Sequence, residues 1–424
     1  RRNYIKRLVL MNVLFKNIKE LVQVREITVD FLSGKEMNIL PTIKNAFLLV
    51  ENGLISNFGV MENCPKTELK IIDASGKMIL PSWCDSHTHI VYAGNREGEF
   101  VDRINGLSYK EIADNGGGIL NSAKKLQTTS EAALYSQSKV RLEEIIHLGT
   151  GAVEIKSGYG LTKNDELKML RVIKKLKEKY PIEIKATFLG AHTVPFEYKN
   201  NKSGYLKMLI DDILPEIKKE NLADFIDVFC EKDYYSVADT EQLLQAGLKQ
   251  GLAGKIHVNQ FTAIGGIQAG IANNVLSVDH LEEMRSEDIE ALKGTKTMPV
   301  ALPSCSYFLN IQYTPARKMI DEGLPLALAS DYNPGSTPSG NMNFVVAAAC
   351  IKMQMTPKEA INAATINGAY AMNLYSKVGS ITKGKLANLI LTKKIPSYNF
   401  IPYSFGNSCI EKVFLKGEEI KYKK

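Results

Sequence analysis

The sequence predicts an α/β protein: a (β/α)8 barrel of the TIM type, with a small β-sandwich domain built from both chain ends. Two observations predict the barrel. From residue 78 onward, short apolar runs rich in β-branched residues alternate with long segments of helical periodicity, which is typical of a parallel sheet covered on both faces. Eight such runs can be counted, the number that closes such a barrel.

The eight runs are short, as buried strands are, and follow one another as MILPSWCDSHTH (78–89), AVEIKSGYG (152–160), IEIKATFLGAH (182–192), FIDVFCEKDYY (225–235), KIHVNQ (255–260), LSVDHLE (276–282), TMPVALPSC (297–305) and LALASDYNP (326–334). Amphipathic segments separate several of them. DELKMLRVIKKLKEKY (165–180), GYLKMLIDDILPEIKKE (204–220) and DTEQLLQAGLKQ (239–250) repeat apolar residues at helical spacing.

The flanking segments have a different pattern, with short apolar strands joined by glycine turns. AFLLVENGLISNFG and LKIIDASGKMIL precede the barrel, and ANLILTKK and IEKVFLKGEEI follow it. Neither part has enough apolar residues to be stable alone, so we expect 11–79 and 376–424 to form one discontinuous β domain beside a barrel at 80–375. Residues 1–10 are expected to be an extension before Met11.

Composition narrows the class of protein. The 424 residues carry a mild net charge of +7, and no Lys/Arg run interleaves with aromatic residues, so a nucleic-acid partner is not expected. The apolar run near the N-terminus is too short to span a membrane. Six cysteines are scattered without a CxxC pair, which fits a reducing compartment. We therefore expect a cytoplasmic protein with no membrane partner.

Histidines gather where the predicted strands end. Five of the six histidines follow a strand, and only His147 lies at a predicted helix end, where we interpret it as structural. Active sites of such barrels lie at the carboxyl ends of the strands. His87 and His89 are two residues apart, so in an extended chain both side chains point to one side while Thr88 points away. Two polar residues in a surface turn would be the alternative.

Three imidazoles and one carboxylate follow strands one, five and eight: His87, His89, His257 and Asp331. This donor set suits Zn²⁺ or Fe²⁺, and a catalytic site keeps one position for water. Asp331 can also take a proton, and His280, on strand six beside the strand of His257, can assist it, so these two are the predicted catalytic residues. The alternative for Asp331 is a helix N-cap in SDYNPGS.

The order H-x-H, His, His, Asp on eight strands resembles the amidohydrolase superfamily. Finer motifs resemble its imidazolonepropionase family: HTHIVYAGNREGEF, VEIKSGYGL, FLGAHTVP, KIHVNQFTAIGG, VDHLE and LASDYNPGSTP. The resemblance runs from about Met11 to the end of the chain. H-x-H and the final Asp are specific only to the superfamily, whereas KSGYGL, GAHTVP and SDYNPGS together are specific to the family.

The resemblance implies hydrolysis of the ring C–N bond of 4-imidazolone-5-propanoate to N-formimidoyl-L-glutamate in histidine degradation, with a divalent ion, Zn or Fe, as cofactor. It also implies that Arg96, Tyr159 and His192 bind the substrate. The residues implied to hold the end of N-formimidoyl-L-glutamate are Asn333, Gly335 and Ser336. Arginine offers a planar fork of donors to a carboxylate, and the NPGS turn can present backbone N–H groups to an anion. A surface ion pair with Glu97 or Glu99 is the alternative for Arg96.

Some positions depart from the family pattern. Ser82, Cys84 and Asn388 are interpreted as packing variation away from the chemistry. Gln260 matters more, because it stands three residues after His257, where some members carry Glu. Glutamine can hydrogen-bond a substrate amide but cannot act as a base, so Gln260 is a predicted substrate-binding residue.

The number of ions also follows from a departure. Binuclear relatives use a carboxylated lysine on strand four, where this chain offers Cys230 and Glu231, while Lys156 lies on strand two. We therefore expect one ion. A different amidohydrolase, such as a nucleobase deaminase or another cyclic-amide hydrolase, and a non-catalytic binding homologue remain alternatives. A small-molecule substrate with a carboxylate is expected, and a homodimer is possible.

Overall fold

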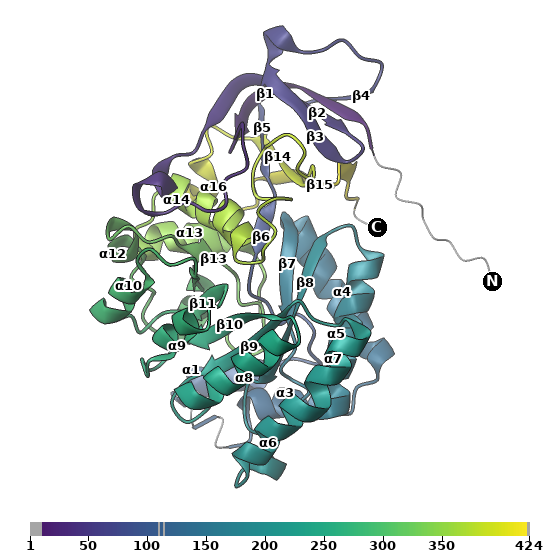
Figure 1. The fold of residues 1–424 in the computed structure, drawn as a ribbon. Helices are drawn as coiled ribbons and strands as arrows, with labels where there is room; N and C mark the ends of the chain where they lie inside the picture. The colour runs from purple at the N-terminus through teal and green to yellow at the C-terminus, as the bar shows by residue number, and fades with distance from the viewer. Residues whose placement is uncertain (1–10, 109–110, 113–114, 422–424) are drawn as a thin grey trace, which may run out of the picture.

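The computed structural model describes residues 11–108, 111–112 and 115–421, and the predicted extension at 1–10 lies outside them. Two eight-stranded sheets organise the chain, one parallel and one mixed (Figure 1). The parallel sheet forms the barrel, and the mixed sheet is assembled from both chain ends. The predicted fold class is confirmed.

The barrel strands pair in parallel and in chain order, each with the next. Almost every residue in them is buried, which explains why each strand reads as a nearly continuous apolar run. They are β6 (Trp83–Asp85), β7 (Thr150–Lys156), β8 (Glu183–Ala191), β9 (Phe225–Cys230), β10 (Ala253–Val258), β11 (Ser277–His280), β12 (Met298–Ala301) and β13 (Ala327–Leu328).

The barrel closes beyond the ends of its first and last strands. The Asp331 amide donates to the His87 carbonyl at 2.9 Å, and the His89 amide donates to the Tyr332 carbonyl at 2.9 Å. Nearer the strands themselves, the Asp85 carboxylate accepts from the Ser330 amide at 2.9 Å. The seam of the barrel therefore lies among the residues predicted to form the site.

Helices cover the outside of the barrel, and several begin at side-chain caps. Thr162 and Ser236 accept from backbone amides at the starts of α5 (Lys163–Lys179) and α8 (Val237–Lys249). The helix predicted at 204–220 is divided instead: α6 (Lys202–Met208) and α7 (Leu214–Glu220) flank a π-helical segment. Pro215, which lacks an amide hydrogen, follows that segment and explains the wider turn.

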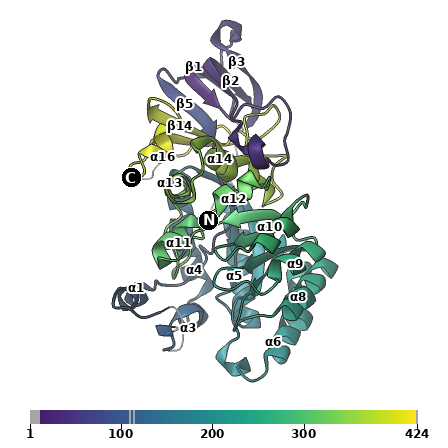
Figure 2. The ribbon, with the colours of Figure 1, turned by 90° about the vertical axis from the view of Figure 1, so that its left-hand side faces the viewer.

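Further helices connect the strands or pack against the barrel: α4 (Glu131–His147), α9 (Gly266–Ala272), α10 (Ser286–Leu292), α11 (Pro303–Leu309), α12 (Ala316–Asp321), α13 (Met342–Met353), α14 (Pro357–Asn362), α15 (Gly368–Tyr370) and α16 (Phe400–Tyr403). Two more, α1 (Glu97–Ile104) and α3 (Gly118–Gln127), follow β6 and lie at the end of the molecule opposite the mixed sheet (Figure 2). Within the described residues, no helix combines the length and apolar character needed to cross a membrane.

The mixed sheet has the order β16-β15-β14-β5-β1-β2-β3, with β4 beside β1. Phe15 of β1 and Phe414 of β15 meet edge to face with ring centroids 5.0 Å apart, although β5 and β14 separate their strands. The sheet must therefore curl around its own apolar core. Its strands are β1 (Val13–Val22), β2 (Thr42–Glu51), β3 (Leu54–Val60), β4 (Lys70–Asp73), β5 (Lys77–Pro81), β14 (Leu389–Lys394), β15 (Ile410–Leu415) and β16 (Glu418–Glu419).

The two sheets join directly, because β5 runs into β6 after one residue. At this joint the Ser82 amide donates to the Asn388 carbonyl at 3.0 Å, and the Asn388 side chain donates to the Gly151 carbonyl at 2.9 Å. The Asn388 side chain thus serves the contact between the sheets, whereas Ser82 contributes only its backbone amide. β5 belongs to the mixed sheet as far as Pro81, and the predicted domain borders at 79/80 and 375/376 stay proposals.

Candidate active site and metal centre

Most of the predicted site residues line one cavity at the carboxyl ends of the barrel strands. Its walls are His89, Arg96, Ile119, Tyr159, His192, Phe229, His257, Gln260, His280, Asp331, Asn333 and Ser336. Of the predicted residues, His87 and Gly335 do not line it: His87 is fully buried beside it, and Gly335 packs behind Arg96. Residues far apart in the sequence thus meet where the barrel fold places an active site.

Four side-chain atoms converge on one point. Nε2 of His89 lies 3.3 Å from Nε2 of His87 and 3.4 Å from Nε2 of His257. Oδ1 of Asp331 lies 3.5 Å from Nε2 of both His87 and His89. Thr88 points away, and its hydroxyl donates to the Glu154 carbonyl at 2.6 Å. The H-x-H spacing therefore directs two imidazoles to the same point, as predicted.

The spacing of these atoms fits a metal ion. In tetrahedral coordination with bonds of about 2.0–2.1 Å, neighbouring ligand atoms stand about 3.3–3.4 Å apart, which matches the three imidazole nitrogens. Burial lowers the pKa of His87 and His89 well below the usual value, with nearby cationic groups adding to the effect. Neutral imidazoles present lone pairs, and lone pairs that face each other call for a cation between them. The donor set therefore fits a divalent ion.

Buried carboxylates orient two of these imidazoles from behind. Nδ1 of His87 lies 2.7 Å from Oδ2 of Asp279, and Nδ1 of His257 lies 3.0 Å from Oδ2 of Asp227. Burial opposes the ionisation of Asp227, but His257 and Lys156 hold its pKa well below the usual value. A carboxylate hydrogen-bonded to Nδ1, as Asp279 is to His87, fixes the ring and leaves the Nε2 lone pair for a metal, while Asp227 stands at ion-pair distance from His257.

These carboxylates belong to a buried ion network across the barrel. Nζ of Lys156 lies 2.5 Å from Glu154, 2.8 Å from Asp227 and 3.7 Å from Asp279. Lys255 contacts Glu154 and lies 3.9 Å from Asp279. Although burial works against its charged form, Asp227 and Glu154 raise the pKa of Lys156.

Sequence reasoning missed most of this network. It considered Lys156 only as a possible bridging ligand, and took Cys230 and Glu231 as the polar residues of strand four. The inward carboxylate of β9 is Asp227 instead, while Glu231 accepts from the Phe261 amide at 3.0 Å. The signal was available as charged residues inside apolar strands, above all in VEIK and KIH.

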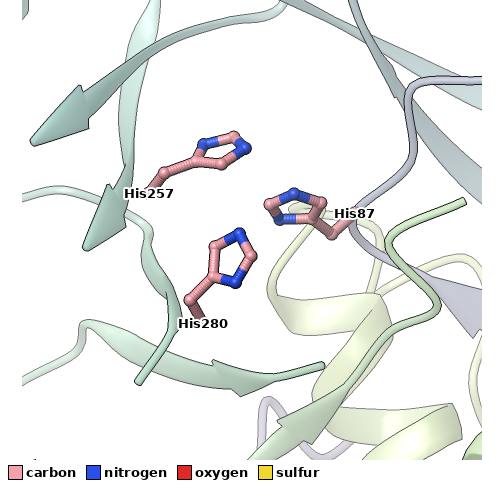
Figure 3. A group of neighbouring side chains, drawn as sticks. All are labelled: His87, His257 and His280. Carbon is pink, nitrogen blue, oxygen red and sulfur yellow. The ribbon is translucent and has the colours of Figure 1, made fainter. Parts of the chain in front are cut away.

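His280 extends the cluster from the end of β11. In Figure 3 the rings of His87, His257 and His280 point toward one another from three parts of the barrel. His280 has a positive φ of 92°, a conformation that is uncommon for a residue with a Cβ and is found at functional sites. Burial disfavours its charged form, yet Glu282 and then Asp331 raise the pKa of His280 overall. It can therefore carry a proton beside Asp331.

Aromatic rings next to His89 form another part of the cavity wall. The His89 and His192 rings stack with centroids 5.3 Å apart and planes 13° apart. Tyr159 packs against His192 with centroids 5.3 Å apart. Nδ1 of His192 lies 3.1 Å from the Gly158 carbonyl, and burial lowers the pKa of His192 to about 3. The neutral His192 ring, with Tyr159 tilted against it, offers an aromatic surface to a planar ring.

Arg96 reaches the cavity from the start of α1. Its side chain is only 5% exposed, and its Nε lies 2.7 Å from Oε2 of Glu99. The alternative of an ion pair with Glu99 is thus observed, but the pair is buried at the cavity and not on the open surface. A Cβ on Gly335 would collide with the guanidinium, so glycine at this position makes room for Arg96.

The turn after β13 differs from the expected anion nest. The amides of Gly335 and Ser336 both donate to Oδ1 of Asn333 at 2.8 Å, so the Asn333 side chain already uses them. The expectation that these N–H groups bind an anion stays a prediction. The Ser336 hydroxyl donates instead to Oδ2 of Asp331 at 3.1 Å. Asn333 and Ser336 thereby order the turn that carries Asp331, and both side chains reach the cavity.

Gln260 lines the cavity next to these residues. It is 8% exposed, and its Nε2 lies 3.5 Å from Sγ of Cys305. His147, in contrast, ends α4 away from the cavity, as its structural interpretation requires.

Comparison with known proteins agrees with this geometry. The model of the family described as "Amidohydrolase family" matches residues 78–420. The chain belongs to the amidohydrolase family. It is 68% identical over 411 residues to the imidazolonepropionase of Flavobacterium johnsoniae, covering 97% of this chain and all of that protein. It is 64% identical to the imidazolonepropionase of Christiangramia forsetii over the same share of both chains.

Among solved structures, an adenosine deaminase from Xanthomonas campestris with bound zinc superposes with a TM-score of 0.72. The match covers 96% of this chain and 92% of the deaminase, at 13% sequence identity. An identity this low supports the fold alone. Family membership makes this chain a hydrolase of a metal-dependent family, and the converging donors around His89 are its candidate metal site.

Proposed function

We propose that this protein is an imidazolonepropionase, which opens the ring of 4-imidazolone-5-propanoate with water to give N-formimidoyl-L-glutamate in histidine degradation. The observation that carries the proposal is one cavity holding both the converging donors around His89 and the buried guanidinium of Arg96. Two relatives that are 68% and 64% identical to this chain are named imidazolonepropionase.

The metal is proposed to be a single divalent ion, Zn or Fe, held by His87, His89, His257 and Asp331. When bound, it supplies a Lewis acid that makes water nucleophilic at neutral pH. A single ion is supported by Lys156, whose Nζ lies within ion-pair distance of Glu154 and Asp227 and is not free to become a carboxylated bridging ligand.

Each remaining residue has a role in binding or proton movement. Arg96 pairs with the propanoate carboxylate, Tyr159 and His192 pack against the ring, and Gln260 hydrogen-bonds the ring amide. Asn333, Gly335 and Ser336 shape the turn beside the newly formed end. A water oxygen bonds to the ring carbonyl carbon, and the bond from that carbon to the ring nitrogen breaks. Asp331 accepts the water proton, and His280 helps to pass it to the leaving nitrogen.

Purified protein with its own metal tests the proposal. Loss of the conjugated ring absorbance of imidazolone propionate should follow addition of enzyme, with about one ion per chain by elemental analysis. A nucleobase deaminase would release ammonia from a base and leave this substrate intact, and a binding homologue would turn over neither. Full activity in rigorously metal-free protein would exclude the metal-dependent mechanism.

The role of Arg96 is tested by substrate choice. Arg96→Met should raise KM about ten- to a hundredfold, because a hydrogen bond to a charged group contributes roughly 1.5–3 kcal/mol. The deficit should shrink for an analogue without the carboxylate. Equal losses on both compounds would make Arg96 structural.

A homodimer in the cytoplasm remains part of the proposal, and sedimentation would test the dimer.

A further inference from the structure

Behind Gln260 lies a group of buried side chains that the proposed reaction uses only in part. His280, Glu282 and Cys305 each offer one potential ligand atom, and these atoms all lie within 4.8 Å of one another. Glu282 is 2% exposed and Cys305 is fully buried. Among the described residues, Oε2 of Glu282 has no hydrogen-bond partner. The proposed reaction assigns no role to Glu282 or Cys305.

The free carboxylate oxygen points to a missing cation. A buried acceptor without a partner carries a desolvation penalty of about 1–3 kcal/mol, and more for a charged group. The other oxygen, Oε1, is 3.5 Å from Nδ1 of His280 and 3.3 Å from the Ser306 hydroxyl. A cation beside Oε2 would satisfy the carboxylate without disturbing either contact of Oε1.

The donor types indicate which cation fits. A thiolate, an imidazole and a carboxylate together favour thiophilic and borderline ions such as Zn²⁺ and Cd²⁺ over Mg²⁺ or Ca²⁺. The charges also balance, because a Cys305 thiolate and the Glu282 carboxylate neutralise a divalent ion. We propose that His280, Glu282 and Cys305 form a second site for a thiophilic divalent cation, and that its occupation inhibits the enzyme.

Binding at this site needs no redox step. The ion bonds to Sγ of Cys305, a ring nitrogen of His280 and an oxygen of Glu282, and the thiol proton leaves to solvent. The way in passes Gln260, which lines the cavity and whose Nε2 contacts the Cys305 sulfur at 3.5 Å. Gln260 is therefore the cavity-lining side chain that the ion must pass to reach the sulfur.

Inhibition follows from the shared histidine. The His280 ring centroid lies 5.6 Å from that of His87 and 5.4 Å from that of His257, so it belongs to both clusters. The inhibition rests on the proposed role of His280 in proton movement, whereas the binding does not.

Cadmium added to the holoenzyme tests the binding directly. We expect about one cadmium per chain to bind while the resident ion stays at its starting content, with an ultraviolet thiolate-to-cadmium charge-transfer band. Cys305→Ser should lose the band and the extra ion. Glu282→Gln, which keeps the thiol, should weaken cadmium binding at least about tenfold, the lower limit for losing even an outer partner of a metal site. Cys350→Ser removes a half-buried thiol elsewhere and should change neither.

Two outcomes would overturn the proposal. One is a band that persists in Cys305→Ser or disappears in Cys350→Ser. The other is cadmium uptake that merely displaces the resident ion without a thiolate band. Activity gives a separate measurement: the half-inhibitory cadmium concentration should rise at least about tenfold in Cys305→Ser. Normal binding without inhibition would leave the cation site in place but overturn the inhibition, and with it the proposed role of His280 in proton movement.

Discussion

The centre of the barrel and the core of the mixed sheet are both buried, yet they are built from opposite materials. The core of the mixed sheet is apolar, with Phe15 against Phe414. The barrel centre below the site holds charged side chains with at most 1% exposure: Glu154, Lys156, Asp227, Lys255 and Asp279. Burying apolar surface stabilises a fold directly, whereas ion pairs must first offset the loss of hydration.

We infer from this difference that the charged residues at the barrel centre serve to position the site, although they stabilise the fold less than an apolar core does. Lys156 holds Asp227, which holds His257, and Asp279 holds His87. The two proposed metal ligands His87 and His257 are thereby held by carboxylates, and both carboxylates lie near the fully buried Lys156. An apolar filling of the same volume could be as stable, but it could not fix the imidazoles.

Substitution of Asp331 is expected to produce the largest loss of activity with little loss of stability. Asp331→Asn should lower kcat at least about a thousandfold, because the amide cannot accept the water proton. The free energy of unfolding of the metal-free protein should change by less than about 1 kcal/mol, the scale of one ordinary hydrogen bond. Steady-state kinetics and urea unfolding measure the two effects. A variant that loses both equally would show that site and stability are not separable here.

The next contrast sets one residue from each region side by side. Lys156→Met leaves buried carboxylates uncompensated and should cost about 3–5 kcal/mol of unfolding free energy. Phe414→Ala should cost a similar amount through a cavity. Metal affinity, measured by competition with a chelator, should fall only in Lys156→Met. Equal loss of affinity in both variants would mean that general destabilisation, and not the ion network, controls the metal site.

A smaller effect is expected one step closer to the ligand. Asp279→Asn keeps the size of the side chain but weakens the contact to Nδ1 of His87. Metal affinity should fall about 10- to 100-fold, as for other outer partners of metal-binding histidines. Asp211→Asn, on an exposed helical position, is the matched control and should leave the affinity unchanged. An unaltered affinity in Asp279→Asn would remove this carboxylate from the site.

The smallest expected effect concerns Gln260. If Asp331 and His280 move the protons, Gln260→Glu should change kcat by less than about tenfold, or about 1.4 kcal/mol of barrier. His280→Asn should cost about a hundredfold or more. The pH profile gives the check: a hundredfold rise in kcat with a new acidic limb in Gln260→Glu would make a carboxylate at this position the base.

Much of the fold was predictable because its signals are local. Eight apolar runs and the helical spacing between them are visible in short windows of sequence, and each run corresponds to a barrel strand. The residues expected at strand ends, such as His89, Tyr159 and His192, do line one cavity. Their convergence follows from barrel geometry alone, since the carboxyl ends of all strands meet at one face.

The remaining features depend on distances between strands, which one sequence does not contain. Asp227 and Asp279 are single charges in apolar strands, and only the barrel shows that they face His257 and His87. The close approach of the Arg96 guanidinium to Gly335 is visible only once the position of Arg96 is known. The use of the turn amides by Asn333 was equally hidden, because an NPGS turn can direct its N–H groups inward or outward.

The seam of the barrel gives these ligands a second consequence. His87 and His89 follow the first strand and Asp331 follows the last, and their backbone hydrogen bonds close the ring. A cation held by all of them would tie together two points separated by most of the barrel sequence, as a disulfide does when it closes a long loop. The metal would then slow the separation of the first and last strands of the barrel. Removal of the metal should first raise the rate of amide hydrogen exchange at His89 and Asp331, before any strand separates.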